Sequence, residues 1–379
     1  MLRILVVVAT CFVAYFSFGQ TAGDTVDIAG LLNAAASVYE DEQLVGLQVA
    51  IFSGGEIRGK LNLGYADVEH LVAVTDETRF EVASLNKTFT GLALLILAEQ
   101  GKINLDEPIQ MLVPEFPEKS DGVVTPRLLA GALGGIRHYE ENERTPDYYA
   151  THYEDVISAL DVFKNDALVT TPGATEFYSS YGYVLLAAAI QRASGERYQD
   201  YISNSVLSPM GLSSTGFVDV RVPMPNRSRH YSFIDPYTRE VHDELRILPT
   251  MDHSAITGGG NMYSSALDLA TFGGNFIAPG LLSDNQIDEI YQPHFTTVGK
   301  PTQFSDGWVV LGASQTPRFL FFGGSYPGTT AYLTVYPDQD LAIAIVTNTW
   351  GKNGSDWTLP MLAKLSEIVA QQQPDSISP

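Results

Sequence analysis

The feature that most constrains the fold is the position of strand-like segments at both ends of the chain, with helix-like segments between them. Residues 44–52 and 57–64 are rich in β-branched and other apolar side chains, and a Ser-Gly-Gly-Glu sequence separates them as a hairpin turn. A second group of strand-like segments follows late in the chain, at 307–312, 318–323, 330–336 and 341–348. We therefore predict one antiparallel sheet that is built from both chain ends.

Helical patterns dominate the middle of the chain. They cover residues 84–100, 154–164, 181–194, 198–205 and 266–272, and another such segment closes the chain at 357–371. The order of segments predicts an α+β fold, in which an antiparallel sheet from both chain ends is flanked by helices and carries a mostly helical insertion. We expect a single domain over 24–373, with an α/β part at 24–83 and 298–373, a mostly helical part at 84–297, and a frayed tail at 374–379.

Composition narrows the class of partner. The chain has 379 residues, 45% of them hydrophobic, which is enough to bury a large core. Its net charge of -22 would repel nucleic-acid phosphates, and no basic run offsets that charge. We expect no nucleic-acid partner and attribute the acidity to solubility.

The first 19 residues resemble a secretory signal peptide. Arg3 precedes an almost unbroken apolar run that ends at Phe18, and small residues at Ser17 and Gly19 suit a cleavage site after Gly19. The run is shorter than a spanning helix, although an uncleaved membrane anchor is the alternative. The chain's one cysteine, Cys11, lies in this segment. We expect a periplasmic or secreted mature protein without thiols.

A Ser-x-x-Lys motif opens the most apolar of the predicted helices. Ser84 and Lys87 are three residues apart and so share a helical face. A serine hydroxyl becomes a good nucleophile when a neighbouring base takes its proton, and a lysine whose pKa is depressed by burial can be that base. Chance alone gives such a pair about once in a chain of this length, but no other lysine here has a serine at that spacing.

Two further segments are candidates for the same site. Tyr178 falls just before an apolar helix, where a loop residue can be catalytic or simply an aromatic side chain of the core. Gly323, Gly324 and Ser325 fall where one predicted strand ends and the next begins. Backbone N–H groups there are candidates for an oxyanion hole, and an ordinary hairpin turn would have the same sequence pattern.

These segments resemble the three motifs of the serine β-lactamase-like and penicillin-binding-protein-like family, in its class C-like branch. The matching residues are 84–87, 178–180 and 322–324, and the flanks at 78–83, 101–106, 172–173 and 258–265 also match. Residues 135–139 and 178–188 are most similar to the mitochondrial serine β-lactamase-like protein and its bacterial relatives, which are regarded as peptidases or esterases.

The resemblance implies a role for each residue. Ser84 would be the acylated nucleophile, Lys87 its proton acceptor, and Tyr178 the acid/base that serves the leaving group. The backbone N–H groups of Ser84 and Ser325, next to Gly324, would form the oxyanion hole. Ser180 would occupy a substrate-binding position that is often Asn. No metal and no organic cofactor is expected.

The chain departs from the family pattern at two places. Phe322 stands where the third motif has Lys or His, and residues 132–135, which begin with Ala132, replace a His-Thr-Ser-Gly-like sequence. Both changes replace polar side chains by apolar ones. They weaken recognition of a free carboxylate, which requires a cation, and favour an ester or an uncharged amide as substrate.

Three functions remain open at this point. The first is an exported serine hydrolase that acts on esters or peptide-like amides through an acyl-enzyme. The second is a catalytically silent binding or scaffold protein, which Phe322 would favour. The third is a true β-lactamase or D-alanyl-D-alanine carboxypeptidase. His138 shows no metal-ligand spacing, so we expect a structural histidine that borders the cleft with Arg137.

Overall fold

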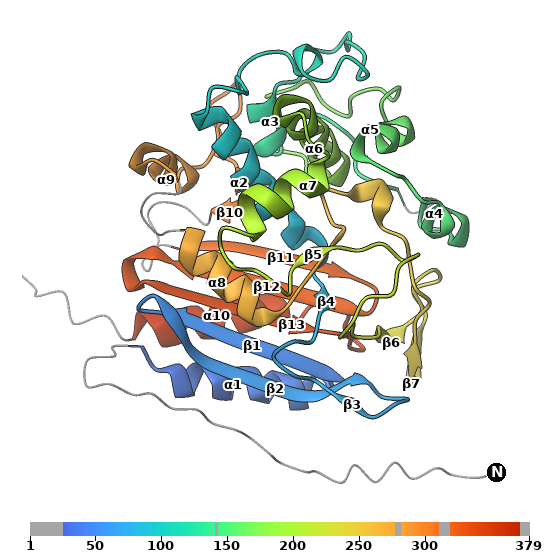
Figure 1. Ribbon diagram of the computed structural model, residues 1–379, viewed down its shortest axis with the longest axis vertical. Coiled ribbons are helices and arrows are strands. Elements are labelled where there is room, and N and C mark those ends of the chain that lie inside the picture. The colour runs from blue at the N-terminus through green and yellow to red at the C-terminus, as the bar shows by residue number, and fades with distance from the viewer. Residues whose placement is uncertain (1–25, 141–142, 277–281, 311–318, 372–379) are drawn as a thin grey trace, which may run out of the picture.

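An antiparallel sheet of eight strands, in the order β3-β2-β1-β13-β12-β11-β10-β9, is the base of the molecule (Figure 1). The computed structural model describes residues 26–140, 143–276, 282–310 and 319–371. The strands of this sheet are β1 (Gly46–Ser53), β2 (Glu56–Asp67), β3 (Val72–Ala73), β9 (Phe304–Ser305), β10 (Trp308–Val310), β11 (Leu320–Tyr326), β12 (Thr329–Tyr336) and β13 (Leu341–Thr347).

The two ends of the chain meet in the centre of this sheet. Strand β1 pairs with β13, with Val49 opposite Ile345, and β13 pairs with β12, with Ala344 opposite Leu333. All seven residues of β13 are buried, as expected of a central strand that is covered on both faces. The predicted sheet from both chain ends is confirmed.

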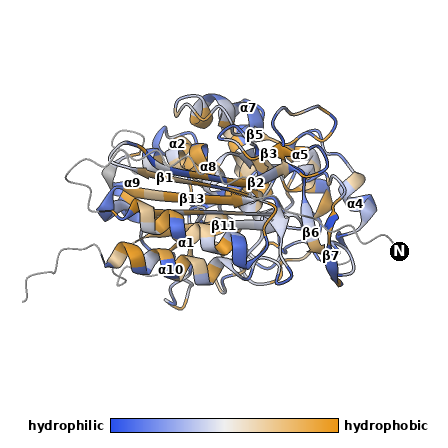
Figure 2. Ribbon diagram, turned by 90° about the horizontal axis from the view of Figure 1, so that it is seen from below, coloured by the Kyte–Doolittle hydropathy of each residue, from blue (hydrophilic) through white to orange (hydrophobic). Residues whose placement is uncertain are grey.

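Helices cover both faces of the sheet. Helices α1 (Ile28–Asp41) and α10 (Thr358–Ala370) pack together on one face, and α8 (Ala266–Phe276) packs on β1, β12 and β13 on the other. Figure 2 shows these layers edge-on, with α1 and α10 on one side of the strands and α8 and α2 on the other. The sequence pattern predicted α10 and α8 but not α1.

The remaining helices form a second body above α8 in Figure 1. Its centre is the contact between α2 (Asn86–Glu99) and α6 (Ser180–Ser194), both of which are almost wholly buried. Gly101 follows α2 with a φ of 66°, which confirms the predicted left-handed end of this helix. The other helices are α3 (Pro126–Ala130), α4 (Pro146–Ala150), α5 (Val156–Ala159), α7 (Tyr198–Ile202) and α9 (Asp284–Ile290).

Residues 84–297 contain more than helices. Two small sheets, with the orders β14-β6-β7 and β4-β8-β5, each combine two strands from this range with one strand from outside it. Their strands are β4 (Phe80–Glu81), β5 (Gly216–Phe217), β6 (Tyr231–Ile234), β7 (Val241–Ile247), β8 (Met262–Ser264) and β14 (Thr349–Trp350). Helix α8 also falls in this range but packs on the main sheet, so the partition of the chain into two parts stays a prediction.

Some expectations concern residues outside the described part of the chain. The predicted signal peptide at 1–19, with its cleavage after Gly19, and the predicted tail at 374–379 both lie there. Within the described ranges, no helix combines the length and the apolar character that a membrane crossing requires.

Strand β11 is longer than its sequence suggested. We expected a strand over 318–323 that ends at the glycines, but β11 continues through Gly323 and Gly324 to Tyr326, and the turn to β12 comes only afterwards. The glycines therefore do not mark a turn. Gly324 lies inside the strand because this strand passes very close to the backbone at 82–84.

Helix α2 approaches the backbone before β10 so closely that position 91 has no room for a side chain. A Cβ atom on Gly91 would lie 1.9 Å from the carbonyl oxygen of Asp306. A glycine-to-alanine change inside a helix normally stabilises by about 1 kcal/mol, but a backbone oxygen cannot rotate away. We expect Gly91→Ala to lower the free energy of unfolding by about 1–3 kcal/mol in urea denaturation. Gly182→Ala in α6, whose nearest neighbour would be 3.5 Å away, is the control and should not destabilise.

Candidate active site

Ser84 lies in a short 3-10 segment, η1 (Ala83–Leu85), that leads directly into α2. It is partly exposed, whereas its neighbours on both sides along the chain are buried. The preceding residue, Ala83, has a φ of 46°, in the left-handed region that non-glycine residues rarely adopt. Strained backbone of this kind is often found at functional sites, where the surrounding structure holds it in place.

Lys87 lies in the first turn of α2 and its side chain is fully buried. Its Nζ atom is 3.2 Å from Ser84 Oγ, 3.1 Å from Ser180 Oγ and 2.6 Å from the carbonyl oxygen of Gly259. Burial lowers the pKa of Lys87 well below its usual value, because an ammonium ion loses its hydration there. The predicted contact between Ser84 and Lys87 is present, and the amine has no carboxylate among its hydrogen-bond partners in the described residues.

Tyr178 lies on the loop just before α6, as its sequence position suggested. Its hydroxyl group donates a hydrogen bond to Ser84 Oγ over 2.8 Å. Burial raises the pKa of Tyr178 to about 12, although hydrogen bonds with Ser84 and Ser180 act in the opposite direction. The phenol is therefore protonated at neutral pH.

Strand β11 passes directly beside the backbone of Ser84. A Cβ atom on Gly324 would lie 2.7 Å from the backbone nitrogen of Ser84 and 2.1 Å from the carbonyl oxygen of Val82, so only glycine fits. The side chain of Ser325 accepts a hydrogen bond from Trp350 Nε1 over 2.7 Å. The hydroxyl of Ser325 is thus already engaged, and the expected oxyanion role of this residue concerns its backbone N–H alone.

His138 borders the site, as expected, through the start of α6. Its Nδ1 atom accepts a hydrogen bond from the backbone N–H of Ser180 over 3.1 Å, and its ring lies 5.3 Å from the ring of Tyr178. Burial, together with the positive charges of Arg144 and Arg137, lowers the pKa of His138 to about 3. The imidazole is therefore neutral, and its Nδ1 is fixed as an acceptor.

Two residues of the site were not among the predicted ones. The carbonyl group of Gly259 holds Lys87, and Asn86 holds Gly259 in place because Asn86 Oδ1 accepts hydrogen bonds from the N–H groups of Gly258 and Asn261 over 3.0 and 3.3 Å. The only signal in the sequence is the glycine-rich run at 258–260. A backbone carbonyl has no residue-specific signature, so this partner of Lys87 could not be read from side chains.

The departure at 132–135 has a structural role. The backbone carbonyl groups of Ala132 and Leu133 accept hydrogen bonds from the N–H groups of Phe177 and Gly173, over 2.7 and 2.8 Å. Ala132 has a φ of 57° and is buried. The segment therefore supports the loop of Tyr178 through its backbone and presents no polar side chain to the site.

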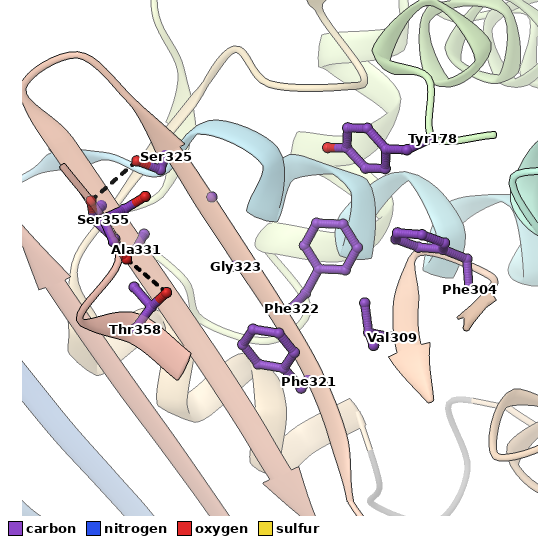
Figure 3. Close-up of a pocket in the computed structure, with 12 residues that line it drawn as sticks. Tyr178, Phe304, Val309, Phe321, Phe322, Gly323, Ser325, Ala331, Ser355 and Thr358 are labelled. Carbon is purple, nitrogen blue, oxygen red and sulfur yellow. Dashed lines mark hydrogen bonds between the residues drawn. The ribbon is translucent and has the colours of Figure 1, made fainter. Parts of the chain in front are cut away.

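A cavity of about 270 Å³ opens beside Tyr178 and follows β11. Figure 3 shows the rings of Tyr178, Phe304 and Phe322 gathered at one end and the hydroxyl groups of Ser325, Ser355 and Thr358 at the other. Phe322 is 3% exposed, and its ring lies 6.2 Å from that of Phe304. The described residues that line the cavity include no Lys, Arg or His: Tyr178, Phe304, Val309, Phe321, Phe322, Gly323, Gly324, Ser325, Thr330, Ala331, Ser355 and Thr358.

The structure thus places Ser84 in contact with Lys87 and Tyr178, and Ser180 in contact with the same two residues, with Gly324 beside Ser84. In the described ranges, no group of three or more His, Cys, Asp or Glu side chains has the arrangement of a metal site. The arrangement provides a partly exposed hydroxyl group with a desolvated amine and a phenol each within hydrogen-bond distance of it, which are the parts of a nucleophile with its acid/base groups.

Comparison with known proteins agrees with this geometry. Residues 30–366 match the family model described as "Beta-lactamase". The chain is 31% identical to the mitochondrial serine beta-lactamase-like protein LACTB of Homo sapiens, in a match that covers 78% of this chain and 69% of that protein. It is 27% identical to penicillin-binding protein 4* of Bacillus subtilis (strain 168) over 327 residues, covering 82% of this chain and 69% of that protein.

A solved structure shows the same fold at lower identity. The D-amino acid amidase from Ochrobactrum anthropi SV3 superposes with a TM-score of 0.74 and 19% identity, over 90% of this chain and 100% of that chain. The family model covers nearly all the described residues and includes every member of the site. The chain therefore belongs to the beta-lactamase family, whose members share a serine-hydrolase fold with an antiparallel sheet and helices.

Proposed function

We propose that this protein is an exported serine hydrolase that cleaves esters or uncharged peptide-like amides through an acyl-enzyme on Ser84. The observation that carries the proposal is the contact of Ser84 Oγ with both Lys87 Nζ and the Tyr178 hydroxyl, at 3.2 and 2.8 Å. Export rests on the leader-like pattern of residues 1–19.

Lys87 Nζ has three oxygen neighbours, which an ammonium ion could also contact with its three N–H groups, and the proposed mechanism uses the neutral amine. Such an amine has two N–H groups and one lone pair. The N–H groups can donate to Ser180 Oγ and to the Gly259 carbonyl, which leaves the lone pair for the hydroxyl proton of Ser84. The depressed pKa of Lys87 supports this protonation state at neutral pH. Lys87 is then the proton acceptor when Ser84 attacks.

Tyr178 supplies the second proton transfer. As Ser84 Oγ forms a bond to the substrate's carbonyl carbon, its proton passes to Lys87. When the bond to the leaving group breaks, the Tyr178 hydroxyl can protonate the departing oxygen or nitrogen. Ser180 contacts Lys87 and Tyr178, so a proton can return from the ammonium ion to the phenolate through its hydroxyl group. Water then hydrolyses the acyl-enzyme by the reverse proton movements.

The cavity favours substrates without a charge next to the scissile bond. Phe322 and Phe304 form an apolar wall beside Tyr178, and a carboxylate there would lose hydration without gaining a cation. The matched relatives include a penicillin-binding protein and the superposed structure is an amidase, which supports acyl transfer from amides as one reaction of this fold. The apolar wall favours the uncharged members of that substrate class.

Covalent labelling tests the nucleophile. We expect a fluorophosphonate probe to label the purified protein at Ser84, detected by mass spectrometry of the labelled peptide, and to leave Ser84→Ala unlabelled. Turnover of a p-nitrophenyl ester should fall by about 10³-fold or more in the same variant. Equal labelling of both proteins would refute covalent catalysis at Ser84. An intact, labelled protein that turns over no ester or lactam would instead support the binding or scaffold function.

The neutral state of Lys87 predicts a pH dependence of stability. Because the pKa of Lys87 is lowered on folding, the unfolded chain binds the extra proton between the folded pKa and about 10.5. The free energy of unfolding must therefore rise with pH in that window, and the term vanishes above it. We expect the difference in free energy of unfolding, wild type minus Lys87→Met, to increase as the pH rises from 7 to 10. A difference that is flat with pH would mean that Lys87 is charged in the folded protein.

The apolar wall can be tested by adding the missing charge. We expect Phe322→Lys to raise the kcat/KM ratio of a chromogenic cephalosporin over an uncharged ester by about 10-fold, because an ammonium ion would face the substrate carboxylate. Phe322→Leu, which removes the ring without adding charge, is the control and should leave that ratio unchanged. Rapid cephalosporin hydrolysis by the wild type would favour a true β-lactamase instead.

A further inference from the structure

A buried carboxylate lies three residues before Ser84, and the reaction outlined above makes no use of it. Glu81 is 2% exposed at the end of β4. Its Oε1 atom pairs with Arg227 Nη2 at 2.5 Å, and its Oε2 atom accepts a hydrogen bond from the hydroxyl group of Tyr326. Its backbone carbonyl accepts a hydrogen bond from Thr329 Oγ1 over 2.6 Å. A charge this deep is stable only when partners of this kind surround it.

Two neutral histidines complete the surroundings of Glu81. His230 Nε2 is 3.7 Å from Glu81 Oε1, and the ring of His253 lies 4.0 Å from the ring of Tyr326 at an interplanar angle of 32°. Burial lowers the pKa of both imidazoles, to about 4 for His253. We call Glu81, Arg227, Tyr326, His230 and His253 the Glu81 cluster.

The Glu81 cluster joins three segments that build the active site. Glu81 is followed by η1, which carries Ser84. Tyr326 directly follows Ser325 on β11, the strand that lies against the backbone of Ser84 at Gly324.

The third segment begins at His253. This residue precedes η6 (Ser254–Ile256), and the N–H of Gly259 donates to the carbonyl of Ile256 over 2.8 Å. The carbonyl of Gly259 in turn holds Lys87 Nζ. Members of the Glu81 cluster therefore lie within a few residues of Ser84, of Ser325 on β11, and of Gly259, whose carbonyl holds Lys87.

We propose that Glu81 and Tyr326 are positioning residues, which hold η1, β11 and the segment 253–260 at the separation that catalysis by Ser84 requires. The proposal rests on the proposed function for its effect on rate, but the positioning itself is a property of the fold. Neither Glu81 nor Tyr326 is among the described residues that line the cavity for the substrate. On β11, the lining residues are 321–325. The effect of Glu81 and Tyr326 must therefore reach the reaction through the three segments.

Tyr326→Phe tests the proposal because it removes one hydroxyl group and keeps the ring against His253. The matched control is Tyr336→Phe on β12, a fully buried tyrosine whose hydroxyl forms a hydrogen bond with Ser366 Oγ of α10 over 3.0 Å, on the opposite side of the sheet. We expect Tyr326→Phe to lower kcat for an uncharged ester by about 10-fold with KM changed by less than about twofold, because small displacements of aligned groups act on the chemical step. Tyr336→Phe should lower the melting temperature to a similar extent and leave kcat unchanged.

Amide hydrogen exchange gives a second measurement that does not depend on turnover. We expect faster exchange at 82–85, 253–260 and 323–326 in Tyr326→Phe, and no change there in Tyr336→Phe. Glu81→Gln should produce the same pattern and replaces Tyr326→Phe if that variant does not fold. Equal effects of the two tyrosine changes on kcat and on exchange would overturn the proposal. A wild type that fluorophosphonate does not label would refute the proposed function, and exchange would still decide the role of the cluster.

Discussion

The burial of the Lys87 amine without a carboxylate partner is the constraint on which the site depends. An ammonium ion in that position would cost several kcal/mol of desolvation, so the folded protein favours the neutral amine, which is a base. Its hydrogen-bond partners come from three separate elements: η1, the start of α6 and the glycine-rich run at 258–260. The contact between α2 and α6, the core of the helical body, is therefore also what desolvates the base. The same packing therefore stabilises the fold and lowers the pKa of Lys87.

The main sheet contributes rigidity rather than reacting groups. Its strand β11 approaches η1 so closely that Gly324 is required, and Ala83 adopts an unfavourable φ on the other side of that contact. Backbone strain of order 1–3 kcal/mol persists only where the surroundings enforce it. Here the surroundings include the Glu81 cluster, whose carboxylate is held by Arg227 and Tyr326 from two different segments. The buried carboxylate of Glu81 thus fixes the relative position of three backbone segments.

Much of this arrangement could be predicted from the sequence, and the exceptions have physical reasons. The periodicity of α2, the hairpin of β1 and β2 and the spacing of Ser84 and Lys87 are local patterns, and each was correct. The extent of β11 was wrong because glycine usually ends a strand, whereas here Gly324 serves a contact with η1 that is distant in sequence. The partner of Lys87 at Gly259 is a backbone carbonyl and has no signature. His138 was expected at the border of the cleft, but its fixed acceptor nitrogen depends on the N–H of Ser180, which only the tertiary structure brings to it.

The charge of the site as a whole limits its chemistry. Burial lowers the pKa of Lys87 and of His138 and raises that of Tyr178, which favours the uncharged form of each, and Phe322 adds an apolar wall where related motifs have a cation. Among the described residues that contact Ser84, these shifts favour a resting state without net charge, in which a negatively charged substrate gains no attraction and loses hydration on entry. In the proposed reaction, charge appears at Lys87 as an ammonium ion and next to Ser84 as an oxyanion. These two opposite charges form together, a short distance apart in a low-dielectric environment, so each stabilises the other in the transition state more than in the ground state. A neutral resting site is thus well suited to acyl transfer from an uncharged ester or amide.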